Sequence, residues 1–333
     1  MLNHLKYNKS FDQLSYDEKT LLEEAKKSIE EFVEQSAEIS DVNYATRNVH
    51  SKAHAVLKGE FHINPDLQED IKYIFDKENY EITARISNAN FKICRKQNPF
   101  PAYGFAFKIK DDAGRTIANY PLVNFPLLPI NSVSVFLKLF TNINRFYIKK
   151  IKSIIPLLFS AYHVVPSIFN LSFLRYFFRF VKKRNDFILS HNFYSVGAYR
   201  FDDKMVKIKL KPQNTPRKFL KKSNKRKQIR SFLKDNEYKA DVLIKICYNI
   251  KYQPINKLHK EWKNTATIKI GEVKFDKNSV QNPSLCENEL LSFNPFESLD
   301  IFRPVGKIQK LREIAYKVSF QTRRKMNLLM KYK

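Results

Sequence analysis

The stretch that decides this fold is FNPFESLDIFRPVGKIQKLREIAYKVSFQTRR, residues 293–324. Three of its residues, Arg312, Tyr316 and Arg323, stand at relative positions 0, 4 and 11. At about 100° per residue, these offsets return to nearly the same face of an α-helix. The spacing therefore predicts a helix that presents a phenol between two guanidinium groups.

This arrangement suits a phenol that gives up its proton. A tyrosine titrates at about pH 10 in water, and a neighbouring cation such as Arg312 favours the deprotonated form. A phenolate is a hard, anionic ligand for ferric iron, and tyrosine is one of the few proximal ligands known for haem. A guanidinium such as that of Arg323 suits a carboxylate. By itself, however, an Arg-x-x-x-Tyr pair is expected about once by chance in a chain this long.

The segment resembles the proximal helix of the haem catalase family, in which the iron-ligating tyrosine follows one arginine and precedes another at this spacing. The resemblance implies that Tyr316 ligates the ferric iron of haem b, that Arg312 keeps the phenolate anionic and that Arg323 binds a propionate. The run LSFNPFESLDIFRPVG, residues 291–306, is also similar to a pattern of small catalase-related proteins. The other motifs of the family should then occur in order along the chain.

The first of them is TRNVHSKAHAVLKGEF, residues 46–61. The alternation after His50 predicts a β-strand. The segment is similar to the one that carries the family's distal histidine, which implies that His50 moves a proton between two peroxide oxygens and that Arg47 contacts a propionate. Imidazole suits this task because its pKa lies near working pH. Without the other motifs, a lone histidine would be read as structural.

The second is EITARISNANF, residues 81–91, which predicts another short strand. Arg85 and Ser87 match the family's Arg-x-Ser pair. The resemblance implies that the arginine meets a propionate and that the serine hydrogen-bonds the distal histidine and sets its tautomer. The alternative is an ordinary polar strand face, and the ordered set of motifs outweighs it.

A β-hairpin is predicted within residues 102–136, because a strand at residues 105–110 meets an Asp-Ala-Gly turn and a second strand returns. In the family, the returning strand leads to an asparagine that polarises bound peroxide, and Asn124 is the candidate for this catalytic role. An ungapped alignment places Val123 there instead, and peroxide dismutation should then be weak. Phe136 falls where the family stacks a phenylalanine on the porphyrin.

Composition limits which partners and which cellular compartment are expected. The 333 residues carry a net charge of +27, which indicates anionic partners unless an AT-rich genome has raised the lysine content. Cys94, Cys247 and Cys286 lack metal-type spacing, which argues against a disulfide framework and a zinc site. Because no apolar secretory signal opens the chain, we expect a cytoplasmic location, with membrane association left open.

The sequence contains one long apolar segment. Between Ser153 and Leu174 no residue is formally charged, and basic runs flank both ends. Such a length could span a bilayer, but Pro156 and Pro166 interrupt helical regularity and polar residues lower the hydrophobicity. We favour a helical excursion packed on the barrel, and a membrane-surface segment or a true span remain the alternatives.

The resemblance covers residues 47–324 and implies an α+β fold: an antiparallel β-barrel of the catalase type wrapped by helices, with a C-terminal proximal haem helix. We expect an N-terminal helical arm at residues 1–40 and a haem-binding barrel domain at residues 41–333, with a helical insertion at about 140–190. Because the chain ends soon after the proximal helix, we expect neither the C-terminal helical domain of full-size catalases nor their nicotinamide nucleotide.

The implied function is a haem-dependent peroxidase that acts on hydrogen peroxide or organic or lipid hydroperoxides through a ferryl intermediate, with an unidentified reductant. One alternative is a catalase that dismutates hydrogen peroxide. Another is a haem-free basic protein that binds a membrane surface or nucleic acid. No specific nucleic acid is expected, because no recognised binding fold surrounds the charge run at residues 217–230. Membrane-surface contact and homo-oligomerisation are left open.

Overall fold

The computed structural model describes residues 4–93, 101–219, 224–282 and 285–331, so Cys94 lies outside the described residues. At its centre, strands pair antiparallel in the order β1–β2–β3–β4–β5–β7–β8–β9, and β9 pairs back with β1. These eight strands therefore form a closed barrel in which each strand pairs with two neighbours. These strands are β1 (Ala53–Ile63), β2 (Asn79–Asn88), β3 (Tyr103–Lys110), β4 (Thr116–Val123), β5 (Phe193–Ser195), β7 (Lys204–Pro212), β8 (Tyr238–Ile246) and β9 (Thr267–Phe275).

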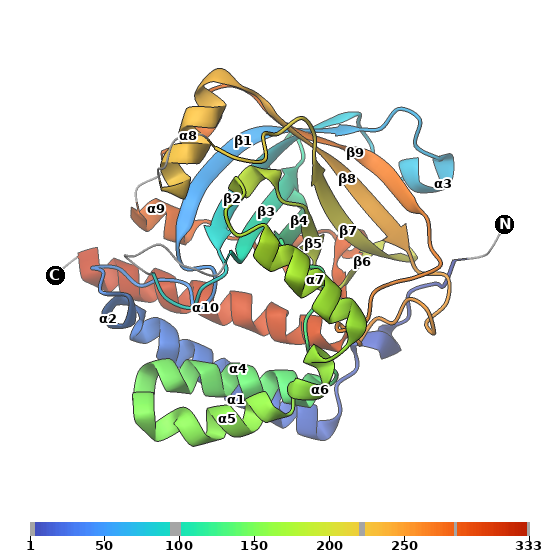
Figure 1. Ribbon diagram of the computed structural model, residues 1–333. Helices are drawn as coiled ribbons and strands as arrows, with labels where there is room; N and C mark the ends of the chain where they lie inside the picture. The colour runs from blue at the N-terminus through green and yellow to red at the C-terminus, as the bar shows by residue number, and fades with distance from the viewer. Residues whose placement is uncertain (1–3, 94–100, 220–223, 283–284, 332–333) are drawn as a thin grey trace.

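The predicted fold class is confirmed: the protein is α+β, with an antiparallel barrel, surrounding helices and a long C-terminal helix (Figure 1). The predicted strand after His50 is β1, and the predicted hairpin is β3–β4. Its turn contains Gly114 with φ of +74°, a left-handed conformation that glycine adopts without steric cost. The division of the chain into an arm at residues 1–40 and a barrel domain at residues 41–333 stays a prediction.

Aromatic rings fill the barrel. The ring of Phe105 lies 5.3 Å from that of Phe193, 6.1 Å from that of Tyr238 and 6.2 Å from that of Phe275, between ring centres. All of them are fully buried. β8 alternates between buried and partly exposed positions throughout its length. These aromatic rings thus form a central part of the barrel core.

Helices cover one side of the barrel in two layers. α10 (Lys307–Lys331) lies against the barrel, and α1 (Tyr16–Glu34) and α4 (Val133–Lys149) lie beneath it in Figure 1. α1 begins at a capping box in which Ser15 and Glu18 bond reciprocally, and Glu18 also pairs with Lys307 of α10 at 3.0 Å. These contacts tie the N-terminal helix to the C-terminal one, across the two layers.

The predicted helical insertion follows α4. It consists of η2 (Lys150–Ser153), α5 (Ile154–Tyr162), α6 (Val165–Ile168) and α7 (Leu171–Lys182). No helix among the described residues is both long enough and apolar enough to cross a membrane. The apolar segment between Ser153 and Leu174 is divided among short helices, and Pro156 and Pro166 lie in the first turns of α5 and α6, where proline is tolerated.

Short elements complete the fold. β6 pairs with β7 and β11, and β10 pairs with β1. The bounds of these elements are β6 (Ala198–Phe201), β10 (Val280–Gln281), β11 (Pro304–Val305), α2 (Ser36–Ser40), α3 (Glu69–Lys72), α8 (Lys225–Asp235), α9 (Leu285–Leu290), η1 (Lys9–Asp12), η3 (Ile188–Ser190), η4 (Pro295–Glu297) and η5 (Asp300–Phe302).

Candidate active site

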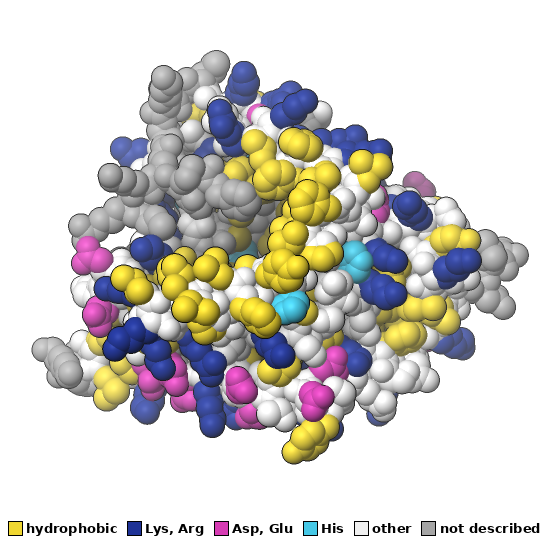
Figure 2. Space-filling view, turned by 60° about the horizontal axis from the view of Figure 1, so that its bottom comes forward, with side chains coloured by type: hydrophobic (Ala, Val, Ile, Leu, Met, Phe, Trp, Pro, Cys, Tyr) yellow, Lys and Arg dark blue, Asp and Glu magenta, His cyan; other side chains and the backbone are white. Residues whose placement is uncertain are grey.

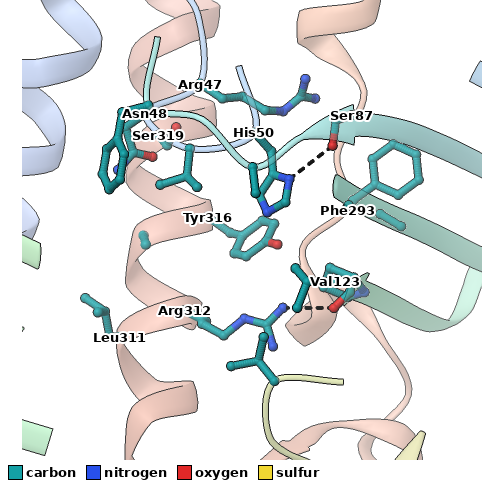
Figure 3. Close-up of a pocket in the computed structure, with 18 of the residues that line it drawn as sticks. Arg47, Asn48, His50, Ser87, Val123, Phe293, Leu311, Arg312, Tyr316 and Ser319 are labelled. Atoms are coloured by element: carbon teal, nitrogen blue, oxygen red, sulfur yellow. Dashed lines mark hydrogen bonds between the residues drawn. The ribbon is translucent and has the colours of Figure 1, made fainter. Parts of the chain in front are cut away.

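A cavity of about 400 Å³ lies between the rim of the barrel and α10 (Figure 3). Its walls come from the segment before β1, from β2, β3 and the end of β4, and from α4 and α10. The volume is in the range of small-molecule and cofactor sites. The structure brings the following predicted site residues together in its lining: Arg47, His50, Arg85, Ser87, Phe136, Arg312, Tyr316 and Arg323.

His50 enters the cavity from the turn before β1. Its φ of 58° is an uncommon, left-handed conformation for a residue other than glycine. Two neighbours on β2 hold it: Arg85 Nη2 donates to the His50 carbonyl at 2.9 Å, and the Ser87 hydroxyl lies 3.1 Å from Nδ1. The ring orientation is therefore set through Nδ1, and Nε2 is the nitrogen left for a ligand.

Gly104 on β3 makes room for this histidine. A Cβ atom at this position would lie 2.5 Å from Cε1 and 2.6 Å from Nδ1 of His50, and 3.0 Å from the Ser87 hydroxyl. Such contacts are too short for a carbon atom, so any larger residue would displace the imidazole. β2 and β3 pair in register at Ser87 and Gly104, which places the serine and the gap side by side.

The surroundings keep His50 neutral. Burial is the largest cause that lowers its pKa from 6.5 to about 3. The positive charges of Arg85, Arg312 and Arg47 act in the same direction. At neutral pH the imidazole is therefore uncharged and can accept a proton. A pKa of about 3 departs from the value near working pH that the sequence suggested, and it makes the imidazole a weak base.

Tyr316 enters the cavity from α10, with Arg312 one turn before it on the same helix, as the sequence predicted (Figure 3). The guanidinium carbon of Arg312 lies 5.8 Å from the centre of the Tyr316 ring. Burial by itself would lower the pKa of Arg312, but the phenol oxygens of Tyr199 and Tyr316 outweigh it and raise that pKa. Arg312 is therefore a permanent cation beside the Tyr316 ring.

Three arginines surround the carboxylate of Glu289, whose side chain is 1% exposed. Arg47 Nη1 lies 3.2 Å and Arg85 Nη2 lies 3.8 Å from Oε1, and Arg323 Nε lies 3.5 Å from Oε2. Burial and the charge of Arg47 lower the pKa of Arg323 to about 9, and Glu289 offsets only part of this effect. One carboxylate leaves three guanidinium groups with a net charge of +2, so the cluster can hold further anions.

These residues fit a haem. Its two propionate carboxylates match the excess positive charge of the arginine cluster, and a tyrosine beside an arginine is a suitable donor for ferric iron. Two buried nitrogen atoms in the cavity wall, Arg85 Nε and Asn48 Nδ2, have no acceptor in the part of the chain that the structure describes. An acceptor-bearing ligand would satisfy both.

Asn124 does not line the cavity with the other predicted site residues. Its Oδ1 accepts from the backbone N–H of Tyr103, and its Nδ2 donates to the carbonyl of Pro101, both at 2.8 Å. Val123, the preceding residue, is the one that lines the cavity. Adjacent residues of a strand point to opposite faces, so only one of the two can face the ligand. We therefore assign Asn124 a structural role and not the catalytic role that the motif suggested.

Sequence reasoning missed Glu289, Gly104 and Asn48. Glu289 stands 242 residues after Arg47, and only the packing of α9 brings them together. Gly104 becomes significant through the β2–β3 register, which the sequence does not display. Asn48 lay within the quoted motif beside Arg47, and its position there was the one available signal.

No protein-family model and no curated protein matches this sequence. Among solved structures, it is similar to a fungal catalase, with 14% identity, a TM-score of 0.60 and coverage of 84% of this chain and 59% of the catalase. Catalase A from Saccharomyces cerevisiae matches with 14% identity, a TM-score of 0.59 and coverage of 86% and 63%, respectively. A bacterial catalase matches with 15% identity, a TM-score of 0.61 and coverage of 89% and 60%.

The chain thus spans about three fifths of the length of these catalases. At such low identity, the likeness concerns the fold alone. The shared architecture is the closed antiparallel barrel with its covering helices. The protein has the catalase fold, and the resemblance first indicated by its C-terminal helix is confirmed at that level.

Proposed function

We propose that this protein binds haem b in the cavity and acts as a peroxidase on hydrogen peroxide or on organic or lipid hydroperoxides. The observation that carries the proposal is that a neutral His50 and an arginine-paired Tyr316 enter one apolar cavity from different walls (Figure 3). A haem bound there supplies the redox-active iron at which the peroxide oxygen–oxygen bond is cleaved.

Residues of this chain would hold both the haem iron and the haem propionates. Tyr316 is the proposed iron ligand, and the guanidinium of Arg312 lies beside its ring. Arg47, Arg85 and Arg323 bind the propionates, since their charge exceeds that of Glu289. Phe136 of α4 contributes an aromatic face to the apolar wall, where it can pack against the porphyrin.

His50 would move the proton. Its Nε2 accepts the proton of the peroxide oxygen that enters, and then donates it to the oxygen that departs as water or as an alcohol. Ser87 keeps the ring oriented through Nδ1 during both transfers. Two electrons and two further protons are needed to reduce the second peroxide oxygen to water, and we assign all of them to an organic donor that is oxidised by two electrons.

The cavity wall near Val123 favours peroxidase action over dismutation. An amide there could polarise a second hydrogen peroxide, but the amide of Asn124 is bonded to the backbone and only the apolar Val123 faces the cavity. The neighbouring lining of Phe136, Leu139 and Phe140 is apolar as well. Such walls suit an organic hydroperoxide better than a second small polar molecule.

The test is the absorption spectrum of the protein purified after expression with ample haem, before and after addition of peroxide. A ferric, tyrosinate-type spectrum that changes with hydrogen peroxide or a fatty-acid hydroperoxide is expected. Tyr316→Phe should abolish stable haem-dependent activity. Tyr120→Phe is the matched control, because Tyr120 is a buried barrel tyrosine that does not line the cavity. A protein that refuses added haemin would overturn the proposal, and oxygen evolution exceeding donor oxidation would replace it with dismutation.

A further inference from the structure

The helical insertion has a charge pattern unlike the rest of the chain. Residues 131–185 contain no aspartate or glutamate at all. They contain ten basic residues: Lys138, Arg145, Lys149, Lys150, Lys152, Arg175, Arg179, Lys182, Lys183 and Arg184. The chain as a whole has 33 acidic residues against 60 basic ones. An acid-free run of this length therefore marks a surface that would repel cations and attract anions.

Within this insertion, three serines face the protein, and most of the apolar side chains of α5 face outward. Ser153, Ser160 and Ser167 are 7%, 6% and 5% exposed, respectively. The Ser160 hydroxyl accepts from Asn142 Nδ2 of α4 at 2.7 Å, which ties α5 to α4 by a polar contact. By contrast, Ile155, Leu158, Phe159 and Tyr162 of α5 are between 62% and 76% exposed. This is the reverse of the usual arrangement for a helix on a water-soluble core.

The exposed apolar surface continues beyond α5. Phe169, Leu171 and Phe178 are 73%, 74% and 62% exposed. Figure 2 shows hydrophobic side chains gathered in one band on this face of the molecule, with Lys and Arg around it and Asp and Glu also present below it. We call the outward-facing residues of η2, α5, α6 and α7 the insertion face. Contiguous apolar surface of this kind marks an interaction site in most folded proteins.

The insertion is packed against the rest of the protein. On its inner side, α7 places the rings of Phe173 and Phe180 each 5.3 Å from the ring of Phe125, which follows β4. Tyr176 donates from its hydroxyl to Glu261 Oε1 at 2.6 Å. The outward side chains are therefore presented by helices already packed on the barrel.

We propose that the insertion face docks on the surface of a lipid bilayer that contains anionic headgroups. Its apolar side chains would enter the boundary between headgroups and acyl chains, and the exposed Lys150, Lys152, Arg175 and Arg179 would meet the headgroup charges. The long stems of such residues lie on apolar surface while their charges stay in water. A second copy of the chain fits less well, because two acid-free, basic faces would repel each other.

The test measures co-sedimentation of the full chain with vesicles of phosphatidylcholine alone and of phosphatidylcholine with about one third phosphatidylserine. Wild-type protein should bind the anionic vesicles, more weakly at high salt and on neutral vesicles. The double variant Leu158→Asp with Phe159→Asp should bind the anionic vesicles at least about tenfold more weakly, because two carboxylates would then have to enter the apolar boundary.

The matched control is Ile250→Asp with Leu299→Asp. Both of its sites are exposed and lie outside the insertion, so the net charge changes equally while the insertion face stays intact. This control should keep nearly all the binding. Far-ultraviolet circular dichroism establishes that both variants fold.

Three results would overturn the proposal. Wild-type protein could fail to bind anionic vesicles, or the insertion-face variant could bind as well as the control. Sedimentation velocity could instead show a dimer that the insertion-face variant dissociates, and a second copy would then be the occupant. Neither the binding assay nor these outcomes depend on haem, so they are independent of the proposed enzymatic function.

Discussion

The cavity and the insertion face are both apolar surfaces accompanied by positive charges, yet the two differ in what those charges can do. In the cavity, Arg85 and Arg323 are buried and held by Glu289, so each guanidinium has a set direction. On the insertion face, the side chains of Lys152 and Arg175 are exposed to solvent. Buried, oriented cations can recognise one carboxylate geometry and shift a neighbouring pKa, whereas solvated cations act through their summed field.

This contrast predicts that cavity substitutions change chemistry and that insertion-face substitutions do not. His50→Ala should leave haem bound but slow peroxide cleavage by about 10²–10⁴-fold, because the proton carrier is lost. Stopped-flow absorbance after mixing with peroxide measures this rate. The matched control is His54→Ala, since His54 is buried on β1 and bonded to Asn88, away from the cavity lining. An unaltered rate in the His50 variant would remove His50 from the mechanism.

Glu289→Gln tests whether the buried charges depend on one another. Removing the carboxylate of Glu289 should lower the free energy of unfolding by about 3–5 kcal/mol without haem, because two buried guanidinium groups and the partly buried one of Arg47 lose their counter-ion. With haem bound, the loss should be smaller, since the propionates supply replacement anions. Urea unfolding with and without haemin measures both values.

The control for this prediction is Glu81→Gln. Glu81 forms an ion pair with Lys110 at 3.1 Å, and its side chain is 54% exposed. An exposed pair contributes about 0–1 kcal/mol. If haemin left the deficit of the Glu289 variant unchanged, the arginines would not be the propionate site.

Asn124→Ala should separate stability from chemistry. Loss of two buried hydrogen bonds to the backbone at Tyr103 and Pro101 should lower the free energy of unfolding by about 1–3 kcal/mol. Peroxide cleavage per bound haem should stay unchanged, because the amide does not reach the cavity. A rate that fell as far as in His50→Ala would return Asn124 to the catalytic role.

The last expected effect concerns pH. The pKa of His50 is about 3 in the folded protein and 6.5 in the unfolded chain, so between these values only the unfolded state binds the proton. Stability should therefore fall as pH falls below 6.5, by about 1.4 kcal/mol per pH unit for this group. Urea unfolding at pH 7 and pH 5 should show a smaller difference in His50→Gln than in wild type. Equal differences would mean that the histidine is not held neutral.

The sequence predicted local elements well and predicted their orientation poorly. Alternation after His50 and the turn at Gly114 are local signals, and β1 and the β3–β4 hairpin followed from them. The choice between Val123 and Asn124 depended on which face of β4 points to the cavity. That face is set by pairing of Val123 with Gly104 and with Tyr194, contacts that are distant along the chain.

The insertion gives a second example of this limit. Its helical character and lack of acidic residues were evident from the sequence, and packing on the barrel was the favoured interpretation. The structure packs α7 on Phe125 but turns the apolar side of α5 outward. Hydrophobic pattern alone predicts an inward apolar face, so the reversal could be found only in the folded molecule.

By itself, the sequence determined the spacing of Arg312, Tyr316 and Arg323, because helical periodicity follows from the backbone of one continuous segment. Only the tertiary structure decided that Glu289 lies among the arginines, that Gly104 leaves room for His50 and that Ser160 of α5 faces inward. Each of these depends on side chains from separate segments meeting in one place, and that meeting is set by barrel closure and helix packing.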